Sequence, residues 1–242
     1  MALKIKPYKK FLPLVTAILL VANVMVYGYF GDYESGIMRF ISMVVFFAFF
    51  LSPRYYKKSA LIIFAVFVFN DLLLIYYEDF INQNIVLFIR LFAYLLMARL
   101  VLPYLKKVKI HLFEGIFIGA ILILNLLLLY SVQGVINAGK NAGWLGELLV
   151  YGYGTATIIL VCAAFTFYSR YFDKASIFFL LAVIGLVMSD LTYFIGFYLE
   201  FYEFYYLDRV FNILAIGFFL HFLFLFKRKV ASGFYDRTLE EI

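Results

Sequence analysis

Residues 176–198 read SIFFLLAVIGLVMSDLTYFIGFY, an apolar run with a single charged residue, Asp190. A helix that crosses a bilayer needs about 20 predominantly apolar residues, so this run predicts a membrane span. A charged side chain within a span is costly unless it is paired or faces a watered cavity, and such residues commonly mark functional sites. The run therefore predicts both a membrane helix and a candidate site at Asp190.

Apolar runs of similar length follow one another along the whole chain. Hydrophobic residues make up 66% of the 242 residues and charged residues only 15%, with a mean hydropathy of +0.98. We predict an all-α membrane protein, with one polytopic domain over 1–229 and a short cytoplasmic tail over 230–242. The eight predicted spans lie at about 11–30, 36–52, 60–77, 85–105, 112–132, 147–168, 176–198 and 205–226.

Lysine and arginine predict the orientation of these spans. They gather in the N-terminus, in alternate loops and in the tail, whereas Lys140 is the one basic residue in the other loops. The positive-inside rule then places both termini in the cytoplasm, and we expect a bacterial inner membrane. The formal net charge of +6 is explained by this bias and by attraction to membrane lipids, so no nucleic-acid partner is predicted.

The charged residues within the spans suggest an internal repeat. Asp71 is followed 19 residues later by Arg90, and Asp190 is followed 19 residues later by Arg209. We therefore predict two four-helix halves in parallel orientation, 11–105 and 112–226. At about 1.5 Å per residue, the aspartate and arginine of each half lie at comparable depth, so each pair is expected to form within its own half.

Polar side chains accompany both aspartates, which suggests a polar cavity between the third, fourth, seventh and eighth spans. Small residues at helical spacing, such as Gly185 and Gly196, are explained by close helix packing, but an aspartate is not. The candidate catalytic residues are Asp71 and Asp190, and the candidate substrate-binding residues are Arg90, Arg209, Tyr94, Asn70, Ser189, Tyr193 and Asn212.

Two short motifs resemble those of the YhhN-type lysoplasmalogenases, small membrane proteins of about eight spans. The family has Ser-Asp followed by apolar residues in a late span, which this chain matches at Ser189-Asp190-Leu191. It has Gly-Asp followed by apolar residues in an early span, where this chain has Asn70-Asp71-Leu72 and so departs at the glycine.

The resemblance implies cleavage of the vinyl-ether bond of a lysophospholipid, with release of a fatty aldehyde. One carboxyl would give a proton to the enol-ether carbon, and the other would stabilise the oxocarbenium ion and orient water. Asp71 and Asp190 are the candidates, in either order, and Arg90 or Arg209 would hold the substrate phosphate. No metal or cofactor is expected, and the sequence contains none of their motifs.

Two other classes of function are consistent with the same residues. The two Asp/Arg pairs would suit a proton- or solute-coupled carrier, although no span has a proline break near its middle. A non-catalytic membrane protein would keep the pairs only for assembly. Neutral variants of the aspartates distinguish these classes of function. An enzyme would lose turnover while still folding, whereas a structural role would lower yield and thermal stability.

Overall fold

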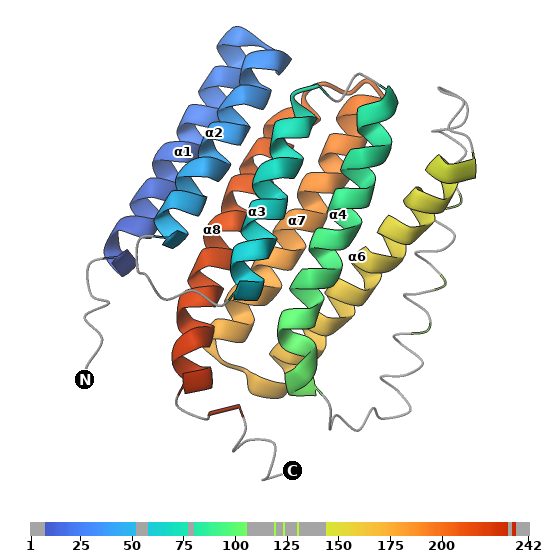
Figure 1. Cartoon of the computed structure of the whole chain (residues 1–242). Helices are drawn as coiled ribbons and strands as arrows, with labels where there is room; N and C mark the ends of the chain where they lie inside the picture. Colours follow the sequence, from blue (N-terminus) through green and yellow to red (C-terminus); the bar gives the residue numbers. More distant parts are fainter. Residues whose placement is uncertain are drawn as a thin grey trace.

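The computed structural model is an all-α bundle that follows the predicted spans (Figure 1). It describes residues 8–51, 58–76, 80–105, 144–231 and 234–235, together with the single positions 119, 123 and 130. Its helices are α1 (Tyr8–Phe30), α2 (Asp32–Leu51), α3 (Lys58–Leu74), α4 (Phe80–Val101), α6 (Trp144–Tyr171), α7 (Lys174–Tyr198) and α8 (Phe204–Ala231), with a 3₁₀ turn, η1 (Leu102–Leu105), after α4.

Six of the described helices are long and apolar enough to cross a membrane, namely α1, α2, α4, α6, α7 and α8. The chain is therefore a multi-pass integral membrane protein. The 17-residue helix α3 corresponds to the third predicted span and packs between α2 and α4. The predicted fifth span, 112–132, lies largely outside the described residues, so the prediction of eight spans extends beyond what they show.

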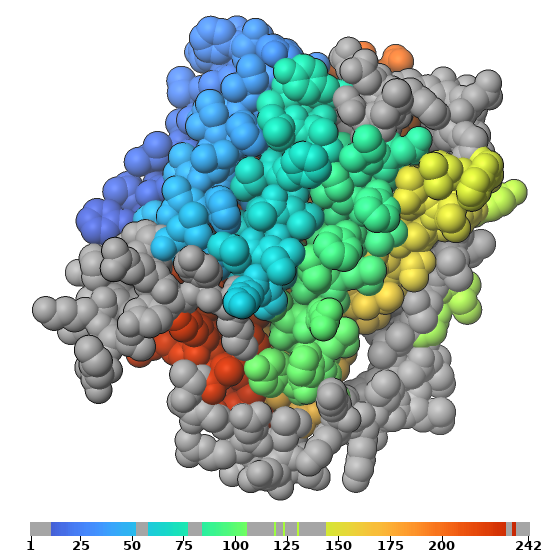
Figure 2. All heavy atoms as spheres, in the orientation of Figure 1, coloured from blue at the N-terminus to red at the C-terminus, as the bar shows by residue number. Residues whose placement is uncertain are grey.

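The described helices form a closed ring that includes α8. Each helix packs against the next in the order α1, α2, α3, α4, α6, α7 and α8. Helix α8 also packs against α1, which closes the ring, and it touches α2 across the ring. In the apolar stretch of α8, 56% of the residues are buried, whereas the corresponding share for α1 is 17%. The face seen in Figure 2 is formed mainly by α2, α3, α4 and α6. The charged residues Asp208 and Arg209 of α8 are accordingly buried inside the bundle.

Short connections at two ends of the bundle fix the register of neighbouring helices. At one end, α1 passes into α2 through Gly31 alone, whose φ of +98° is a conformation that side chains with a Cβ rarely adopt. We call this the Gly31 end; the α7–α8 connection lies there too (Figure 1). At the opposite end, Asp173 caps α7 by accepting a hydrogen bond from the Ser176 amide at 2.7 Å.

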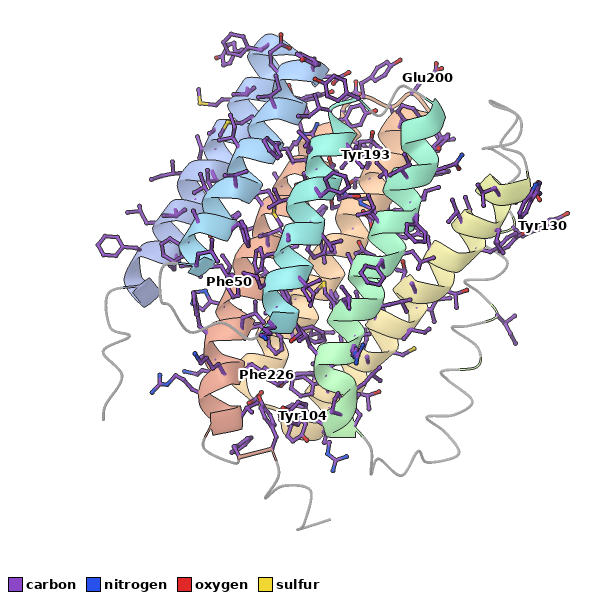
Figure 3. The ribbon with its side chains drawn as sticks, in the orientation of Figure 1. Phe50, Tyr104, Tyr130, Tyr193, Glu200 and Phe226 are labelled. Atoms are coloured by element: carbon purple, nitrogen blue, oxygen red, sulfur yellow. The ribbon has the colours of Figure 1, made fainter. Side chains whose placement is uncertain are left out.

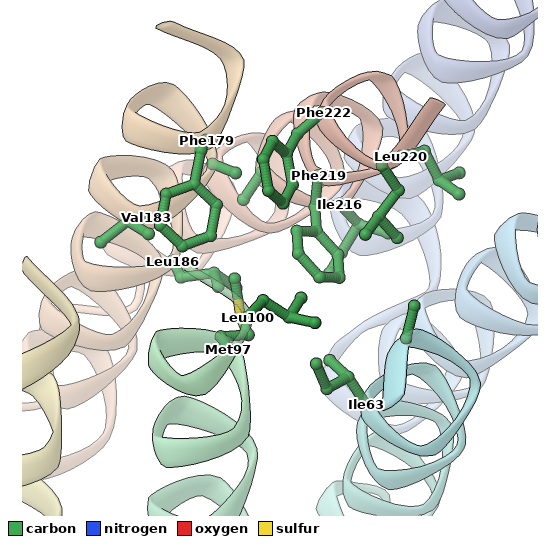
Figure 4. Packing of buried hydrophobic residues seen from close by; sticks show 14 of the residues in the cluster. Ile63, Met97, Leu100, Phe179, Val183, Leu186, Ile216, Phe219, Leu220 and Phe222 are labelled. Atoms are coloured by element: carbon green, nitrogen blue, oxygen red, sulfur yellow. The ribbon is translucent and has the colours of Figure 1, made fainter. Parts of the chain in front are cut away.

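Helices α7 and α8 share the most extensive interface of the described part, and a glycine allows their approach. A Cβ built on Gly185 would lie 2.9 Å from the Cβ of Ala215, closer than real Cβ atoms come. Around this crossing, aromatic and aliphatic side chains of α3, α4, α7 and α8 interlock, including Ile63, Met97 and Phe219 (Figure 4). The interface aligns Ser189 of α7 with Asp208 of α8.

Apolar side chains on the outside of the bundle are exposed, as expected for a surface that faces lipid. On α1 they recur at helical spacing along one stripe, formed by Phe11, Leu14, Ile18, Val21 and Met25. Part of the predicted tail, by contrast, packs onto the bundle. Tyr235 is 1% exposed, and its ring lies among Tyr104, Tyr171 and Phe226 at the Asp173 end, where Figure 3 labels two of them.

Candidate functional site

Charged side chains from five helices lie inside the bundle, between its core and the Gly31 end. A buried charge is expensive without a partner of opposite sign, so each must find one. They divide into two networks that meet near Asp71. The six charged residues are Arg39, Asp71, Arg90, Asp190, Asp208 and Arg209.

The first network, here called the α4–α7 network, surrounds Asp190 with three hydrogen-bond donors. Arg90 donates to Oδ1, and the hydroxyl groups of Tyr94 and Tyr153 donate to Oδ2. Arg90 and Tyr94 are four residues apart on α4, which places them on one face of the helix. Tyr153 comes from α6. Both oxygens of Asp190 therefore already act as acceptors.

The second network, here called the α2–α8 network, is centred on Asp208. Arg39 Nη1 and Arg209 Nη1 both donate to Oδ2 of Asp208, at 2.8 Å and 2.7 Å. The Ser189 hydroxyl donates to Oδ1, and Arg209 Nε donates to the Ser35 hydroxyl at 2.7 Å. The side chain of Asp208 is fully buried. One carboxylate thus connects α2, α7 and α8.

Asp71 joins this network through a longer contact. Its Oδ1 lies 3.4 Å from Arg39 Nε, and no described residue donates a hydrogen bond to its carboxyl group. Arg39 is also held by Asn212, whose carboxamide oxygen, turned toward it, accepts from Nε at 3.2 Å and from Nη2. Asp71 is therefore the least tightly bound carboxylate of the site, although it is only 4% exposed.

A cavity of about 330 Å³ lies above the α2–α8 network, at the Gly31 end. Its polar wall includes Arg39 and Arg209, with Asp32 nearer the start of α2. Aromatic side chains form much of the remaining wall, from α2, α7, α8 and the end of α3; they are Tyr33, Tyr76, Tyr193, Phe197 and Tyr205. Figure 3 places Tyr193 in this upper part of the bundle. A few polar groups within an apolar wall are typical of ligand sites.

A second, much smaller pocket of about 10 Å³ lies deeper and contains Asp71. Asn70, Arg90, Tyr94 and Asn212 also border it, and Arg39 borders both this pocket and the larger cavity. The carboxamide oxygen of Asn70 is buried and has no hydrogen-bond partner within the described part of the chain. The two networks meet at this pocket, because Arg90 belongs to one and Arg39 to the other.

The predicted pairing of aspartate and arginine within each half of the chain is wrong. Asp190 pairs with Arg90 of the other half, Asp71 with Arg39, and Arg209 with the adjacent Asp208. Two side chains must lie at a similar depth to pair, but depth alone does not say which helices are neighbours. The proposed repeat of 11–105 and 112–226 therefore loses the argument from paired charges.

The predicted polar cavity between spans three, four, seven and eight corresponds to the small pocket, which α3, α4, α7 and α8 line together with α2. The larger cavity takes its walls from α2, α3, α7 and α8, while α4 contributes Arg90 and Tyr94 only to the small pocket. The predicted residues Tyr193 and Arg209 line the larger cavity, and Asn70, Asp71 and Asn212 line the small one. Ser189 and Asp190 line neither, and act through Asp208 and Arg90.

Three important residues were not among the predicted site residues. Arg39 and Asp208 carry the α2–α8 network, and Tyr153 completes the surroundings of Asp190. Arg39 and Asp208 could have been found, since both are charges within apolar runs. Tyr153 had no such signal, because it is one of 21 tyrosines.

Comparison with known proteins gives no relative for this chain: no protein family, curated protein or solved structure matches it. Among the described residues, no three histidine, cysteine or acidic side chains lie together as a set of metal ligands. Inference about function therefore rests on the charges, hydroxyl groups and cavities of the site.

Proposed function

We propose that the protein is an intramembrane hydrolase of the lysoplasmalogenase type, which cleaves the vinyl-ether bond of a lysophospholipid. The observation that supports it is the contrast between two carboxyl groups inside the bundle. Asp190 accepts from three donors, whereas Asp71 has only a long contact to Arg39 and borders a pocket. Acid catalysis of this kind uses two carboxyl groups whose surroundings give them different roles.

In this proposal Asp71 is the proton donor. Its carboxyl proton adds to the alkenyl carbon distal to the ether oxygen, and the electron pair of the double bond forms the new C–H bond. The resulting oxocarbenium ion takes up water at the carbon beside oxygen, and the released proton returns to Asp71. The hemiacetal hydroxyl then loses its proton as the C=O bond forms, the ether oxygen takes up a proton as the C–O bond breaks, and the products are a fatty aldehyde and a glycerophospho alcohol.

Asp190 supplies fixed negative charge in this scheme rather than a proton. Both of its oxygens accept hydrogen bonds, so it is occupied as an acceptor, and its donors Arg90 and Tyr94 line the pocket that contains Asp71. A preorganised charge near a developing cation stabilises the transition state without rearrangement. Asp190 also fixes the positions of Arg90 and Tyr94 beside Asp71.

The larger cavity is proposed as the site of the substrate head group. Arg209 lines it, and guanidinium groups bind phosphate well, so Arg209 replaces Arg90 as the preferred phosphate ligand. The volume of about 330 Å³ lies at the lower end of the range for small-molecule sites. If both termini are cytoplasmic, as the lysine and arginine bias predicts, the cavity opens toward the outer side of a bacterial inner membrane.

The test is aldehyde release from an alkenyl lysophospholipid by the purified protein in detergent or nanodiscs. We expect turnover by the wild type and a loss of at least about 100-fold in Asp71→Asn and Asp190→Asn. Glu34→Gln is the matched control, because Glu34 is an exposed carboxylate in α2 that lines neither cavity. No release from folded wild-type protein would remove this substrate class.

A proton-coupled carrier is the second candidate, and the position of Arg39 between the two cavities favours it. Arg39 borders both, and acidic and basic side chains alternate from Arg209 through Asp71 toward Asp190. Such chains of ionisable groups line proton pathways in membrane proteins. Proton flux into liposomes that contain the protein, abolished by Asp71→Asn and present without any lipid hydrolysis, would favour the carrier.

A further inference from the structure

The small pocket between the two networks has unsatisfied polar groups on its walls. The Asn70 side chain is 1% exposed, and its carboxamide oxygen has no partner among the described residues. Asp71 borders the same pocket and receives no hydrogen bond from those residues. Leaving such groups unpaired in a protein interior costs about 1–3 kcal/mol each, so native structures usually satisfy them.

The dimensions and chemistry of the pocket match one water molecule. Its volume is about 10 Å³, close to the minimum that holds a single water. A buried water needs two to four polar partners, and Asn70, Asp71 and Arg90 all border the pocket. Arg90 uses Nη1 for Asp190, which leaves its other N–H groups as donors.

We propose that this pocket binds one ordered water that joins the two charge networks, and that Asn70 is the residue that positions it. The water donates hydrogen bonds to the Asn70 carboxamide oxygen and to Asp71, and accepts one from Arg90. It thereby connects Asp71 with Arg90, and through Arg90 with Asp190.

The water gives Asn70 a role in catalysis without contact with the substrate. In the reaction proposed above, on which this part rests, the water fixes the orientation of the Asp71 carboxyl group as it loses and regains its proton. Small misplacement of a catalytic group can lower the rate about 100-fold. The existence of the water does not depend on that reaction, so the two are tested separately.

The first test is an experimental structure of the full chain in nanodiscs at a resolution that reveals ordered waters. We expect one water within hydrogen-bonding distance of both Asn70 and Asp71 in the wild type, and none in Asn70→Leu. A map that shows waters elsewhere in the bundle but none in this pocket overturns the proposal, whether or not the protein hydrolyses a lipid.

The second test measures thermal stability, which also needs no substrate. If water satisfies Asn70, Asn70→Leu expels it and removes its bond to Asp71, so Tm should fall. If the pocket is dry, leucine replaces an unpaired polar group and Tm should rise. A rise overturns the proposal.

The third test separates kcat from KM in the aldehyde-release assay. We expect Asn70→Leu to lower kcat about 100-fold with KM changed less than about 3-fold, and Asn70→Ser, which retains a polar group and space for water, to recover much of kcat. Equal kcat in Asn70→Leu and wild type would overturn the positioning role.

The matched control is Asn23→Leu in α1. Asn23 is equally buried, its carboxamide oxygen also has no described partner, and it lines neither cavity. It donates to the Leu19 carbonyl at 2.8 Å and to the Ser42 hydroxyl at 2.7 Å, so its loss should lower Tm and leave kcat unchanged. Absence of turnover in the wild type would contradict the proposed hydrolase activity. The density map and the Tm measurements would still test whether the pocket binds a water.

Discussion

The α2–α8 network and the α4–α7 network place similar charges in different surroundings. In the first, Asp208 is shared by two arginines and Ser189, and the side chains of Arg39 and Asp208 are 2% and 0% exposed. In the second, Arg90 and Asp190 form a single ion pair whose side chains are 11% and 13% exposed, with two tyrosines as further donors. The first network joins α2, α7 and α8 in a fully buried setting, and the second joins α4, α6 and α7 with part of its ion pair exposed.

The comparison indicates that burial and number of partners determine how much each charge contributes to stability. Replacing one member of a fully buried cluster leaves several charges without partners, and relaxation cannot bring water to them. Where tyrosine hydroxyls and some exposure remain, the loss of one partner is smaller. The following variants test this difference, from the largest expected effect to the smallest.

Asp208→Leu should be the most destabilising change. It leaves Arg39 and Arg209 without their shared acceptor inside the bundle, so we expect a loss of about 3–5 kcal/mol and poor yield. Thermal unfolding in detergent, followed by circular dichroism or by a thiol dye at Cys162, measures it. A loss below that of Arg90→Met would contradict the structural role given to the α2–α8 network.

Arg90→Met should destabilise the protein less, by about 1.5–3 kcal/mol, because Asp190 keeps the hydroxyl groups of Tyr94 and Tyr153. The same variant should lose most aldehyde release, since Arg90 borders the pocket of Asp71. Parallel measurements of Tm and turnover separate the two effects. Full activity in a folded Arg90→Met protein would count against the proposed site.

Tyr153→Phe should cost about 1 kcal/mol, since it removes one hydroxyl donor to Asp190 and keeps the ring. Tyr94→Phe is the matched variant on α4, and its ring lies 5.6 Å from that of Tyr153. Because both hydroxyl groups bond the same oxygen, we expect the double variant to depart from the sum of the single ones. Strict additivity in unfolding experiments would mean that the hydroxyl groups do not share Asp190.

The smallest effect is expected at the Asp173 end, where Asp173, which lies between α6 and α7, pairs with Lys229 near the end of α8. Burial raises the pKa of Asp173, but hydrogen bonds from Lys229 and Ser176 outweigh it, so the pKa is lowered. A lowered pKa in the folded state stabilises the protein above the unfolded pKa of about 3.9, and this contribution is lost as pH falls through the folded pKa.

Lys229→Gln should therefore cost at most about 1 kcal/mol at neutral pH and low salt, and less in high salt. The difference in Tm between wild type and variant should shrink as the pH falls below about 4. Tm measured across pH at two salt concentrations checks both effects. A difference that grows on acidification would contradict the pairing.

The apolar pattern alone predicted most of the helices correctly. Predicted spans such as 147–168 and 205–226 lie within the observed helices Trp144–Tyr171 and Phe204–Ala231. This succeeds because a bilayer leaves the backbone few alternatives to the helix, so length and hydropathy suffice. The sequence also identified Asp71 and Asp190 as carboxylates within helices of the bundle, since a charge in a membrane span stands out against its neighbours.

Only the tertiary structure decided which charges meet. Position in a span gives the depth of a side chain, but its partner depends on the order of helices around the bundle and on their rotation. The contact of α2 with α8 brought Arg39 to Asp208, and the packing of α4, α6 and α7 brought Arg90 and Tyr153 to Asp190. Those contacts arise from side-chain packing between distant segments, which a one-dimensional pattern of hydropathy does not contain.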